Sequence, residues 1–441
     1  MRTIDLRGRV LSAAEMLQAV PRATQARAEA LAIAQRIVDD VRGRGEIALR
    51  EQAERFDGVS GHAIRVPEEH IEEALAALDG RIRSALEQAI SRVRAGSAAQ
   101  VPAEQVTEIA PGARITQRWQ PVGRAGVYIP GGKAVYPSSV IMNVVPAQVA
   151  GVARIALASP PQAEFAGRVH PTILAAAGLL GVTEVYAIGG AGAIAAFAWG
   201  VDTLGLDPVD VVSGPGNNFV AAAKRAVSGI VGIDSEAGAT EILVVADDTA
   251  DARLVAADLV SQAEHDEQAS AVLVTASADL ADRAAVEVDV LAARTRHSER
   301  VRAALAGPQS AIVLVDDQET AAAFSNAYAP EHLELHLADA ESAAADFTSA
   351  GAIFLGESTP VSLGDYLAGS NHVLPTGGQA RYAAGLGAYT FLRPQQVVCY
   401  DRAALGAVRE QIVLLAQAEA LPAHGEAIEA RFPDAGAPSH G

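Results

Sequence analysis

A glutamate and a histidine stand side by side in the segment YAPEHLEL, residues 328–335. Glu331 and His332 follow Pro330 directly. A carboxylate beside an imidazole is typical of two settings, a solvated turn or the acid–base centre of an enzyme. An imidazole with an ordinary pKa of about 6.5 accepts a proton at neutral pH, as general-base catalysis requires. The pair is therefore a candidate catalytic pair, and its neighbourhood in the fold decides between the two settings.

Amide, imidazole and carboxylate side chains occur together in DLVSQAEHDEQ, residues 258–268. Gln262 and His265 are three residues apart at the end of a predicted helix, so they share one face of it. Such nitrogen and oxygen ligands suit a zinc enzyme that keeps one position for substrate. The spacing alone favours a metal site only weakly, because a single histidine is more often a surface residue.

Two further segments supply the same kinds of side chain. SLGDYLAGSNHVLP contains Asp365 and His372 in a loop too rich in glycine and serine to be core. EALPAHGEA contains Glu419 and His424 around a predicted helix break. The chain has one cysteine, so a zinc site built from a thiolate cluster is excluded. Cys399 lies in the apolar, strand-like run QVVCYD, where we expect a small buried side chain rather than a nucleophile.

Glycine-rich turns follow three predicted strands: YIPGGKAVYPSS (128–139), GGAGAIA (189–195) and SGPGNN (213–218). The second matches the dinucleotide spacing G-x-G-x-x-A and is followed by Asp210 at a suitable distance. A glycine-rich turn is also common by chance in a chain with 39 glycines. Backbone N–H groups at such turns bind phosphate, and open α/β sheets bind ligands at the carboxyl ends of their strands. The three turns together predict a ligand site at the carboxyl ends of these strands.

The elements that must position these residues follow an α/β rhythm. From about residue 125, short Val/Ile/Leu runs alternate with amphipathic or alanine-rich helical segments, and the alternation restarts after residue 240. This pattern predicts parallel sheets covered on both faces. The fold class is therefore α/β, with two tandem Rossmann-like units, an N-terminal helical segment and a C-terminal helical segment.

Four segments are expected along the chain. Residues 1–124 form an N-terminal helical segment with a short β-like stretch, with helical blocks at 14–57 and 67–96. Residues 125–240 and 241–375 form the first and second α/β domains. Residues 376–441 form a helical extension that is broken at Pro422 and ends in a disordered tail.

Charge and composition exclude several classes of function. The 441 residues carry a formal net charge of −19, which disfavours nucleic acid and anionic membranes as partners. Charged residues near the N-terminus do not fit a signal peptide, and no apolar run is long enough to span a membrane. A single cysteine excludes an intramolecular disulfide. We expect a soluble protein of the cytoplasm.

The motifs LVSQAEHDEQ, AYAPEHLEL and SLGDYLAGSNHVLPTGG, with YIPGG, GPGN and EAGATEI, resemble histidinol dehydrogenase over nearly the whole chain and in the same order. The resemblance implies a zinc-dependent enzyme that oxidises L-histidinol through L-histidinal to L-histidine and reduces two NAD. It also implies a homodimer in which the partner chain completes each active site, and the C-terminal helical segment serves in dimerisation.

Site residues follow from the same resemblance, motif by motif. The implied zinc ligands are Gln262, His265, Asp365 and His424, and the implied acid–base pair is Glu331 and His332. Substrate contacts are implied for Thr240 and Glu419, together with His332 and the zinc ligands. NAD contacts are implied for Tyr128 and Asn217, and for position 192.

Position 192 departs from the family pattern, which has glutamine there in contact with NAD. This chain has Gly192 instead, and the substitution creates the apparent dinucleotide fingerprint, so that match is discounted. We expect weaker cofactor binding or a water in place of the amide, and a gain in NAD affinity for Gly192→Gln.

Three alternatives remain. A related metal- and NAD-dependent dehydrogenase of another small amino- or sulfo-alcohol should lack Glu419 or the LPAHGEA segment. An aldehyde dehydrogenase that forms a thiohemiacetal would need Cys399. A nucleotide-binding or assembly protein without activity has no need of the ligand and acid–base residues together.

Overall fold

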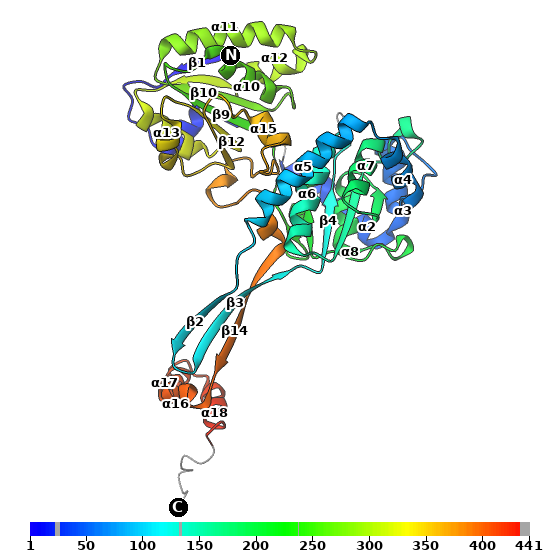
Figure 1. Cartoon of the computed structure of the whole chain (residues 1–441), viewed down its shortest axis with the longest axis vertical. Coiled ribbons are helices and arrows are strands. Elements are labelled where there is room, and N and C mark those ends of the chain that lie inside the picture. Colours follow the sequence, from blue (N-terminus) through cyan, green and yellow to red (C-terminus); the bar gives the residue numbers. More distant parts are fainter. Residues whose placement is uncertain (23–26, 132–134, 237, 433–441) are drawn as a thin grey trace, which may run out of the picture. The chain divides into compact units, whose positions relative to one another are not determined.

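The structure is a computed structural model that describes residues 1–22, 27–131, 135–236 and 238–432. Their contacts divide the chain into two units, both drawn in Figure 1. Unit 1 comprises residues 1–101 and 122–391, and unit 2 comprises residues 102–121 and 392–441. The four segments predicted from the sequence are a finer division and stay a prediction. Within the described residues, no helix is long and apolar enough to cross a membrane.

Unit 1 contains a parallel five-stranded sheet made of the first set of predicted strands. Its spatial order is β6 (Val185–Ala187), β5 (Arg154–Ser159), β4 (Arg124–Tyr128), β7 (Val211–Ser213) and β8 (Gly232–Ile233). The helices that follow these strands are α6 (Pro137–Ala150), α7 (Pro171–Leu179), α8 (Gly190–Trp199) and α9 (Asn218–Val227). Strands β4, β6 and β7 are buried throughout, as expected for a parallel sheet covered by helices.

A second parallel sheet in unit 1 has six strands. Its order is β1 (Arg2–Asp5), β11 (Ala311–Leu314), β10 (Ser270–Thr275), β9 (Glu241–Ala246), β12 (His332–His336) and β13 (Ala352–Leu355). Alternate residues of β9 belong to two separate cores. Ile242 packs with α10 (Ala252–Ala263), α11 (Ala278–Arg294) and α12 (Ser298–Ala306), whereas Leu243 packs with α1 (Ala13–Ala19) and α13 (Gln318–Tyr328). Two parallel α/β units, as predicted, are therefore present.

The N-terminal region is mostly helical, and its elements pack into both α/β halves of unit 1. They are α2 (Arg27–Arg44), α3 (Glu46–Gln52), a π-helix (Ala53–Asp57), α4 (Glu68–Ala77) and α5 (Gly80–Ala98). Helix α2 packs against α8 and α9, while strand β1 pairs with β11 of the six-stranded sheet. The predicted block 67–96 is two helices, because Asp79 Oδ1 accepts the first backbone N–H groups of α5 and starts a new helix.

Unit 2 combines an antiparallel sheet with short helices. The sheet order is β14 (Leu392–Tyr400), β3 (Ala113–Pro121) and β2 (Gln105–Ala110), and the helices are α16 (Arg402–Ala407), α17 (Arg409–Ala418) and α18 (Pro422–Glu429). The predicted break is confirmed, since Pro422 is the first residue of α18. The expectation that Cys399 is buried is wrong, because β14 is exposed beyond Leu392. The predicted disordered tail falls on residues 433–441, outside the described residues.

Candidate active site

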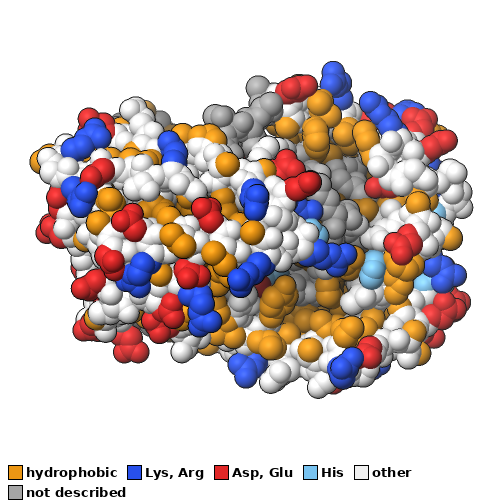
Figure 2. Space-filling view, turned by 90° about the horizontal axis from the view of Figure 1, so that it is seen from above, with side chains coloured by type: hydrophobic (Ala, Val, Ile, Leu, Met, Phe, Trp, Pro, Cys, Tyr) orange, Lys and Arg blue, Asp and Glu red, His pale blue; other side chains and the backbone are white. Residues whose placement is uncertain are grey.

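A cavity of about 1080 Å³ in unit 1 is bordered by loops of both parallel sheets. Residues singled out in the sequence line it, among them Tyr128, Asn217, Thr240, His265, Glu331, His332, Asp365 and His372. Parts of two predicted glycine turns, 189–191 and 215–218, line the same cavity. In the third turn, residues 132–134 lie outside the described residues. On the face that Figure 2 shows, acidic and basic side chains are interspersed, and the surface is hollowed near its centre.

The two sheets present opposite edges to this cavity. Tyr128 ends β4 and Gly189 follows β6, so the five-stranded sheet contributes its carboxyl edge, where ligands were predicted. Thr240 precedes β9, and Glu331 and His332 stand at the start of β12. The six-stranded sheet therefore contributes its amino edge, where the helices that precede and follow these strands have their carboxyl ends.

The Glu331 carboxylate is buried at this edge and held by two donors. Its Oε2 accepts hydrogen bonds from the Thr240 hydroxyl at 2.6 Å and from the Glu241 backbone N–H at 2.9 Å. The Thr240 hydroxyl in turn accepts from Gln262 Nε2 at 2.6 Å. Burial raises the pKa of Glu331, although the adjacent His332 and the two hydrogen bonds oppose the shift. A raised pKa makes this carboxylate a better base.

The His332 ring is fixed beside Glu331. Its Nδ1 lies 3.0 Å from the Glu241 carbonyl oxygen and 3.6 Å from Glu331 Oε2. A carbonyl oxygen only accepts, so Nδ1 carries the hydrogen of the neutral imidazole, and Nε2 is left as the basic atom. His332 is buried and lines the cavity, so it does not lie on a solvated turn.

An arginine far away in the sequence supports the pair. Arg22 Nε contacts Glu241 Oε1 at 2.5 Å, and its guanidinium lies 4.1 Å from the centre of the Tyr328 ring. Arg22 thus ties the first residue of β9 to the end of α13, which precedes β12. Ala329, which ends α13, adopts the left-handed conformation with φ of 47° and turns the chain toward Glu331. Sequence reasoning missed Arg22, since 219 residues separate it from Glu241.

Three of the predicted metal ligands belong to unit 1. Gln262 is buried in the last turn of α10, and His265 follows that helix, with its N–H donating to the Gln262 carbonyl oxygen at 3.2 Å. Asp365 lies in α15 (Val361–Tyr366). His372 also lines the cavity, and its Nδ1 is 3.0 Å from the Asp365 carbonyl oxygen. Burial lowers the pKa of His372, so its neutral form is favoured.

The cofactor residues predicted from the sequence lie at the carboxyl edge of the five-stranded sheet. The Tyr128 hydroxyl accepts from the Gly190 N–H at 3.0 Å, at the start of α8, and burial raises the pKa of Tyr128 to about 12. Asn217 caps α9, because its Oδ1 accepts from the N–H groups of Phe219 and Val220 at 3.0 and 3.2 Å. Gly192 is buried in α8 and offers no side chain to the cavity.

The chain is similar to known proteins in both sequence and fold. The sequence profile of the family described as histidinol dehydrogenase matches residues 20–432. The histidinol dehydrogenase of Leifsonia xyli subsp. xyli is 66% identical over 432 residues, which cover 98% of this chain and 99% of the relative. That of Mycolicibacterium smegmatis is 55% identical, with 98% of both chains covered. The crystal structure of histidinol dehydrogenase from Elizabethkingia anophelis superposes with a TM-score of 0.92 at 33% identity, covering 98% of each chain.

This chain belongs to the histidinol dehydrogenase family. The resemblance inferred from the motifs is therefore confirmed, as is the α/β fold class. The roles that the family implies for individual residues stay predictions. Glu419 and His424, for which the resemblance implied substrate and zinc contacts, belong to unit 2, where Glu419 ends α17 and His424 lies in the first turn of α18, both exposed.

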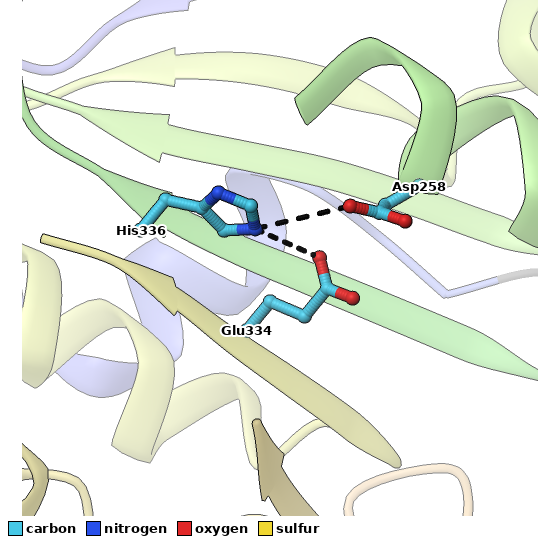
Figure 3. Close-up of side chains that lie close together, drawn as sticks. All are labelled: Asp258, Glu334 and His336. Atoms are coloured by element: carbon cyan, nitrogen blue, oxygen red, sulfur yellow. Dashed lines mark hydrogen bonds and ion pairs between the residues drawn. The ribbon is translucent and has the colours of Figure 1, made fainter. Parts of the chain in front are cut away.

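Unit 1 of this family member also holds an ionisable cluster that the sequence analysis did not predict (Figure 3). His336 Nε2 lies 3.3 Å from Glu334 Oε2 and 3.8 Å from Asp258 Oδ2. The other Glu334 oxygen accepts from the Val361 N–H at 2.8 Å, at the start of α15. A sequence signal exists in hindsight, because alternate residues of the strand HLELH face one side of the sheet.

The cluster shares strand β12 and helix α10 with the candidate active site. It does not line the cavity, and Glu334 and His336 are buried. Burial, together with the Glu334 charge, raises the pKa of Asp258 to about 7. Burial alone would lower the pKa of His336, but the hydrogen bond to Glu334 and the charges of Glu334, Asp258 and Glu357 outweigh it and raise that pKa. Both shifts favour the protonated forms of Asp258 and His336.

Proposed function

We propose that this chain oxidises L-histidinol through L-histidinal to L-histidine, as an NAD-dependent oxidoreductase of histidine biosynthesis. The observation that carries the proposal is the buried Glu331–His332 pair, which lines the cavity. The same cavity is bordered by the carboxyl edge of the five-stranded sheet, where glycine turns precede helices. A dehydrogenase needs a base and a hydride acceptor at one place. The proposed base lies on one wall of this cavity, and the sheet edge proposed to bind NAD forms another. We also propose the cytoplasm as its location, in keeping with the lone cysteine.

Gln262, His265, Asp365 and His424 are the residues that would hold zinc. The Gln262 amide N–H donates to Thr240, which leaves the amide oxygen as the atom able to bind a cation. His265 and Asp365 line the same cavity and add an imidazole and a carboxylate, a donor set that suits zinc. When bound, the metal supplies positive charge that orients the amino and imidazole nitrogens of the substrate and stabilises an alkoxide.

His332 is assigned the proton of the alcohol. Its Nε2 is the basic atom because Nδ1–H is held by the Glu241 carbonyl oxygen. Removal of the hydroxyl proton by Nε2 accompanies loss of a hydride from the same carbon, so the alcohol becomes an aldehyde and the two electrons leave with the hydride. Tyr128 and Asn217 would hold NAD, which would supply the acceptor for that hydride.

Glu331 is assigned the second half of the reaction. The aldehyde must add water before it loses another hydride, and the buried carboxylate, with its raised pKa, is a suitable base for that water. The protonated His332 returns its proton to the carbonyl oxygen as the water adds, which makes the ring neutral again. It then takes a proton from the hydrate as the second hydride leaves, and a carboxylic acid results. Two neighbouring bases thus serve a four-electron oxidation, for which a simple alcohol dehydrogenase would need only one.

Substrate contacts are proposed for Thr240 and Glu419, with His332 and the metal ligands. The Thr240 hydroxyl joins Gln262 to Glu331, so one residue couples a ligand of the metal to the proposed base. The nitrogens of the substrate carry N–H groups that donate hydrogen bonds, and a carboxylate such as Glu419 is suited to accept one. Tyr128 and Asn217 are proposed to contact NAD.

A homodimer is proposed from the packing of unit 2. Among the residues of this unit that the structure describes, the buried apolar side chains are Ala113, Leu392, Ala404 and Ala416. Its exposed apolar side chains include Val106, Ile109, Val398, Leu414, Leu415 and Leu421. A unit of this size with so small a core needs a covering surface. We propose that a second copy of the chain provides it, with each active site completed by the partner.

The dimer is tested with Leu414→Glu/Leu415→Glu, which places charges on this apolar surface. We expect a monomer with little histidinol oxidation, because buried charges oppose association. Light scattering measures the mass, and the exposed, charged Glu410→Gln on the same helix serves as the control. A double variant that keeps twice the mass of the chain contradicts the proposed interface.

The function itself is tested by NADH production from L-histidinol. The expected stoichiometry is two NADH per substrate, and a chelator should abolish turnover until zinc is restored. One NADH per substrate would indicate an alcohol dehydrogenase that stops at the aldehyde. The second candidate, a related dehydrogenase of another small amino- or sulfo-alcohol, is excluded if such alcohols give no NADH under the same conditions.

A further inference from the structure

The side chain of Gln52 occupies the space beside Gly192. Gln52 is the last residue of α3, directly before the π-helix, and its carboxamide packs on the first turn of α8. A Cβ on residue 192 would overlap Gln52 Oε1, and would lie 3.2 Å from Leu49 Cδ2. Since the overlap involves the far end of a flexible side chain, glycine at 192 is what allows the carboxamide to lie there.

This carboxamide is at the wall of the cavity and has an unused donor. Gln52 lines the cavity, and its Nε2 is buried with no hydrogen-bond partner among the described residues. Buried amide groups are nearly always hydrogen-bonded, because an unsatisfied donor loses its hydration without compensation. Because Gln52 lines the cavity, a ligand there can accept this hydrogen bond once the flexible side chain turns its amide toward the cavity.

The neighbours of Gln52 define what kind of acceptor fits. Asp57, at the end of the π-helix, lines the same cavity, and a Cβ on Gly189 would lie 3.3 Å from its Oδ2. Gly189 and Gly192 are three residues apart, so the amide and the carboxylate lie against one face of the start of α8. A carboxylate repels phosphate but accepts a hydrogen bond from a hydroxyl. A sugar diol satisfies both groups, since its hydroxyls accept from the amide and donate to the carboxylate.

We propose that Gln52 is a cofactor-binding residue, and that its Nε2 donates to a ribose hydroxyl of NAD from the space that Gly192 leaves open. The inference rests on the proposed function, because it takes NAD to be the ligand of this half of the cavity. It also replaces the expectation that the amide missing at 192 is lost to the site. The amide comes instead from a different helix.

The first experiment measures NADH binding by fluorescence titration of the zinc-loaded, full-length protein. Gln52→Met keeps the length of the side chain and removes the donor, and we expect about tenfold weaker binding, the usual effect of one lost hydrogen bond. Gly192→Ala pushes the carboxamide aside while Gln52 remains, so it should weaken binding as well. The control is Gln35→Ala on α2, where an exposed amide donates to Asp39 at 3.0 Å; its affinity should not change.

The second experiment exchanges the two side chains. Gly192→Gln alone should weaken NADH binding, because two carboxamides would compete for one space. The double variant Gln52→Ala/Gly192→Gln should restore the affinity to within about threefold, since one amide again occupies that space. Such a rescue is not expected if Gln52 serves only to pack α3 on α8. A thermal melt of each variant shows that it is folded.

The inference is overturned if folded Gln52→Met and Gly192→Ala bind NADH as tightly as the unaltered protein. In that case the unaltered protein still produces two NADH from L-histidinol, and the proposed function stands. If the unaltered protein neither binds NADH nor oxidises L-histidinol, both the inference and the proposed function fail. A gain of affinity in Gly192→Gln alone would also overturn the inference, because it would show that the space at 192 is not filled.

Discussion

The two parallel sheets of unit 1 differ in the edge that each presents to the cavity. At the carboxyl edge of the five-stranded sheet, helices α8 and α9 begin, so backbone N–H groups and the positive ends of helix dipoles face outward. At the amino edge of the six-stranded sheet, helices α10 and α13 end, with the negative ends of their dipoles. The first edge suits an anionic dinucleotide, and the second suits a metal ion with the substrate that it would orient.

The side chains follow the same division. The carboxyl edge offers mostly uncharged groups, the Tyr128 hydroxyl, the Asn217 amide and the glycine turns, together with the Asp57 carboxylate beside Gly189. The amino edge offers ionisable groups, chiefly Glu331 and His332. The two sheets are of the same parallel type, but they form different parts of the site, because the six-stranded sheet presents the opposite edge to the cavity. If this comparison holds, changes at the amino edge should affect chemistry, and changes at the carboxyl edge should affect cofactor affinity.

The largest effect is expected for His332→Ala. Loss of the base should lower kcat for both half-reactions by about 10²- to 10⁴-fold, the usual contribution of general-base catalysis. NADH affinity should stay within about threefold, because the ring lies at the other edge of the cavity. Stopped-flow absorbance and NADH titration measure the two quantities. A variant that loses NADH affinity as much as turnover would break the comparison.

A smaller and more selective effect is expected for Glu331→Gln. The amide keeps the shape of the carboxylate and removes its basicity, so oxidation of L-histidinal should fall by about 10²-fold or more. Oxidation of L-histidinol to the aldehyde should be nearly unaffected. Each half-reaction is followed separately, with L-histidinol or L-histidinal as the starting substrate. Equal losses in both would reject the division of roles between Glu331 and His332.

The carboxyl edge is tested with Tyr128→Phe. This change removes the hydroxyl that accepts from the Gly190 N–H, and its proton is no longer available to the cofactor. We expect NADH affinity to fall about three- to tenfold, which corresponds to one hydrogen bond, while zinc content and the KM for L-histidinol stay the same. Calorimetric titration with NADH and metal analysis provide the readouts. A change in KM for L-histidinol with unchanged NADH affinity would show that Tyr128 acts on the substrate, contrary to the assignment of the carboxyl edge to the cofactor.

Much of this arrangement was predictable from the sequence. The α/β class follows from the alternation of short apolar runs and helices, and the carboxyl-edge turns follow from glycines after strands. The Glu331–His332 pair is visible because its two residues are adjacent. Contacts between distant segments gave no such signal: the pairing of Arg22 with Glu241, and the packing of Gln52 on Gly192, depend on how helices and strands pack in space.

The edge used by the second sheet was also beyond sequence reasoning. The sequence pattern of alternating strands and helices is the same whichever edge of the sheet binds the ligand. The general rule for open α/β sheets favours the carboxyl edge. A short β-like stretch before residue 124 and a strand-like run at Cys399 were predicted, but their pairing in the antiparallel sheet of unit 2 was not. Its strand β2 is exposed throughout, so it lacks the apolar alternation by which strands are recognised.

The smallest effect is expected at the carboxyl end of β12, four residues along the strand from His332. Asp258, Glu334 and His336 lie there outside the cavity, so they should influence stability rather than chemistry. The pKa values of Asp258 and His336 are both raised in the folded protein, to about 7 for Asp258. Both groups therefore bind protons more tightly in the folded state than in the unfolded state.

The sign of the pH dependence follows from this. At pH 6 the folded cluster holds protons that the unfolded chain holds less tightly, and that contribution to stability is lost as the pH rises through about 7. The part due to Asp258 should be about 1 kcal/mol between pH 6 and pH 9. Asp258→Asn should reduce the fall in the free energy of unfolding by this amount, as measured by urea denaturation at the two pH values. Its kcat should stay within about threefold of the unaltered protein, and a larger loss of activity would mean that the ionisable groups at the two ends of β12 act together.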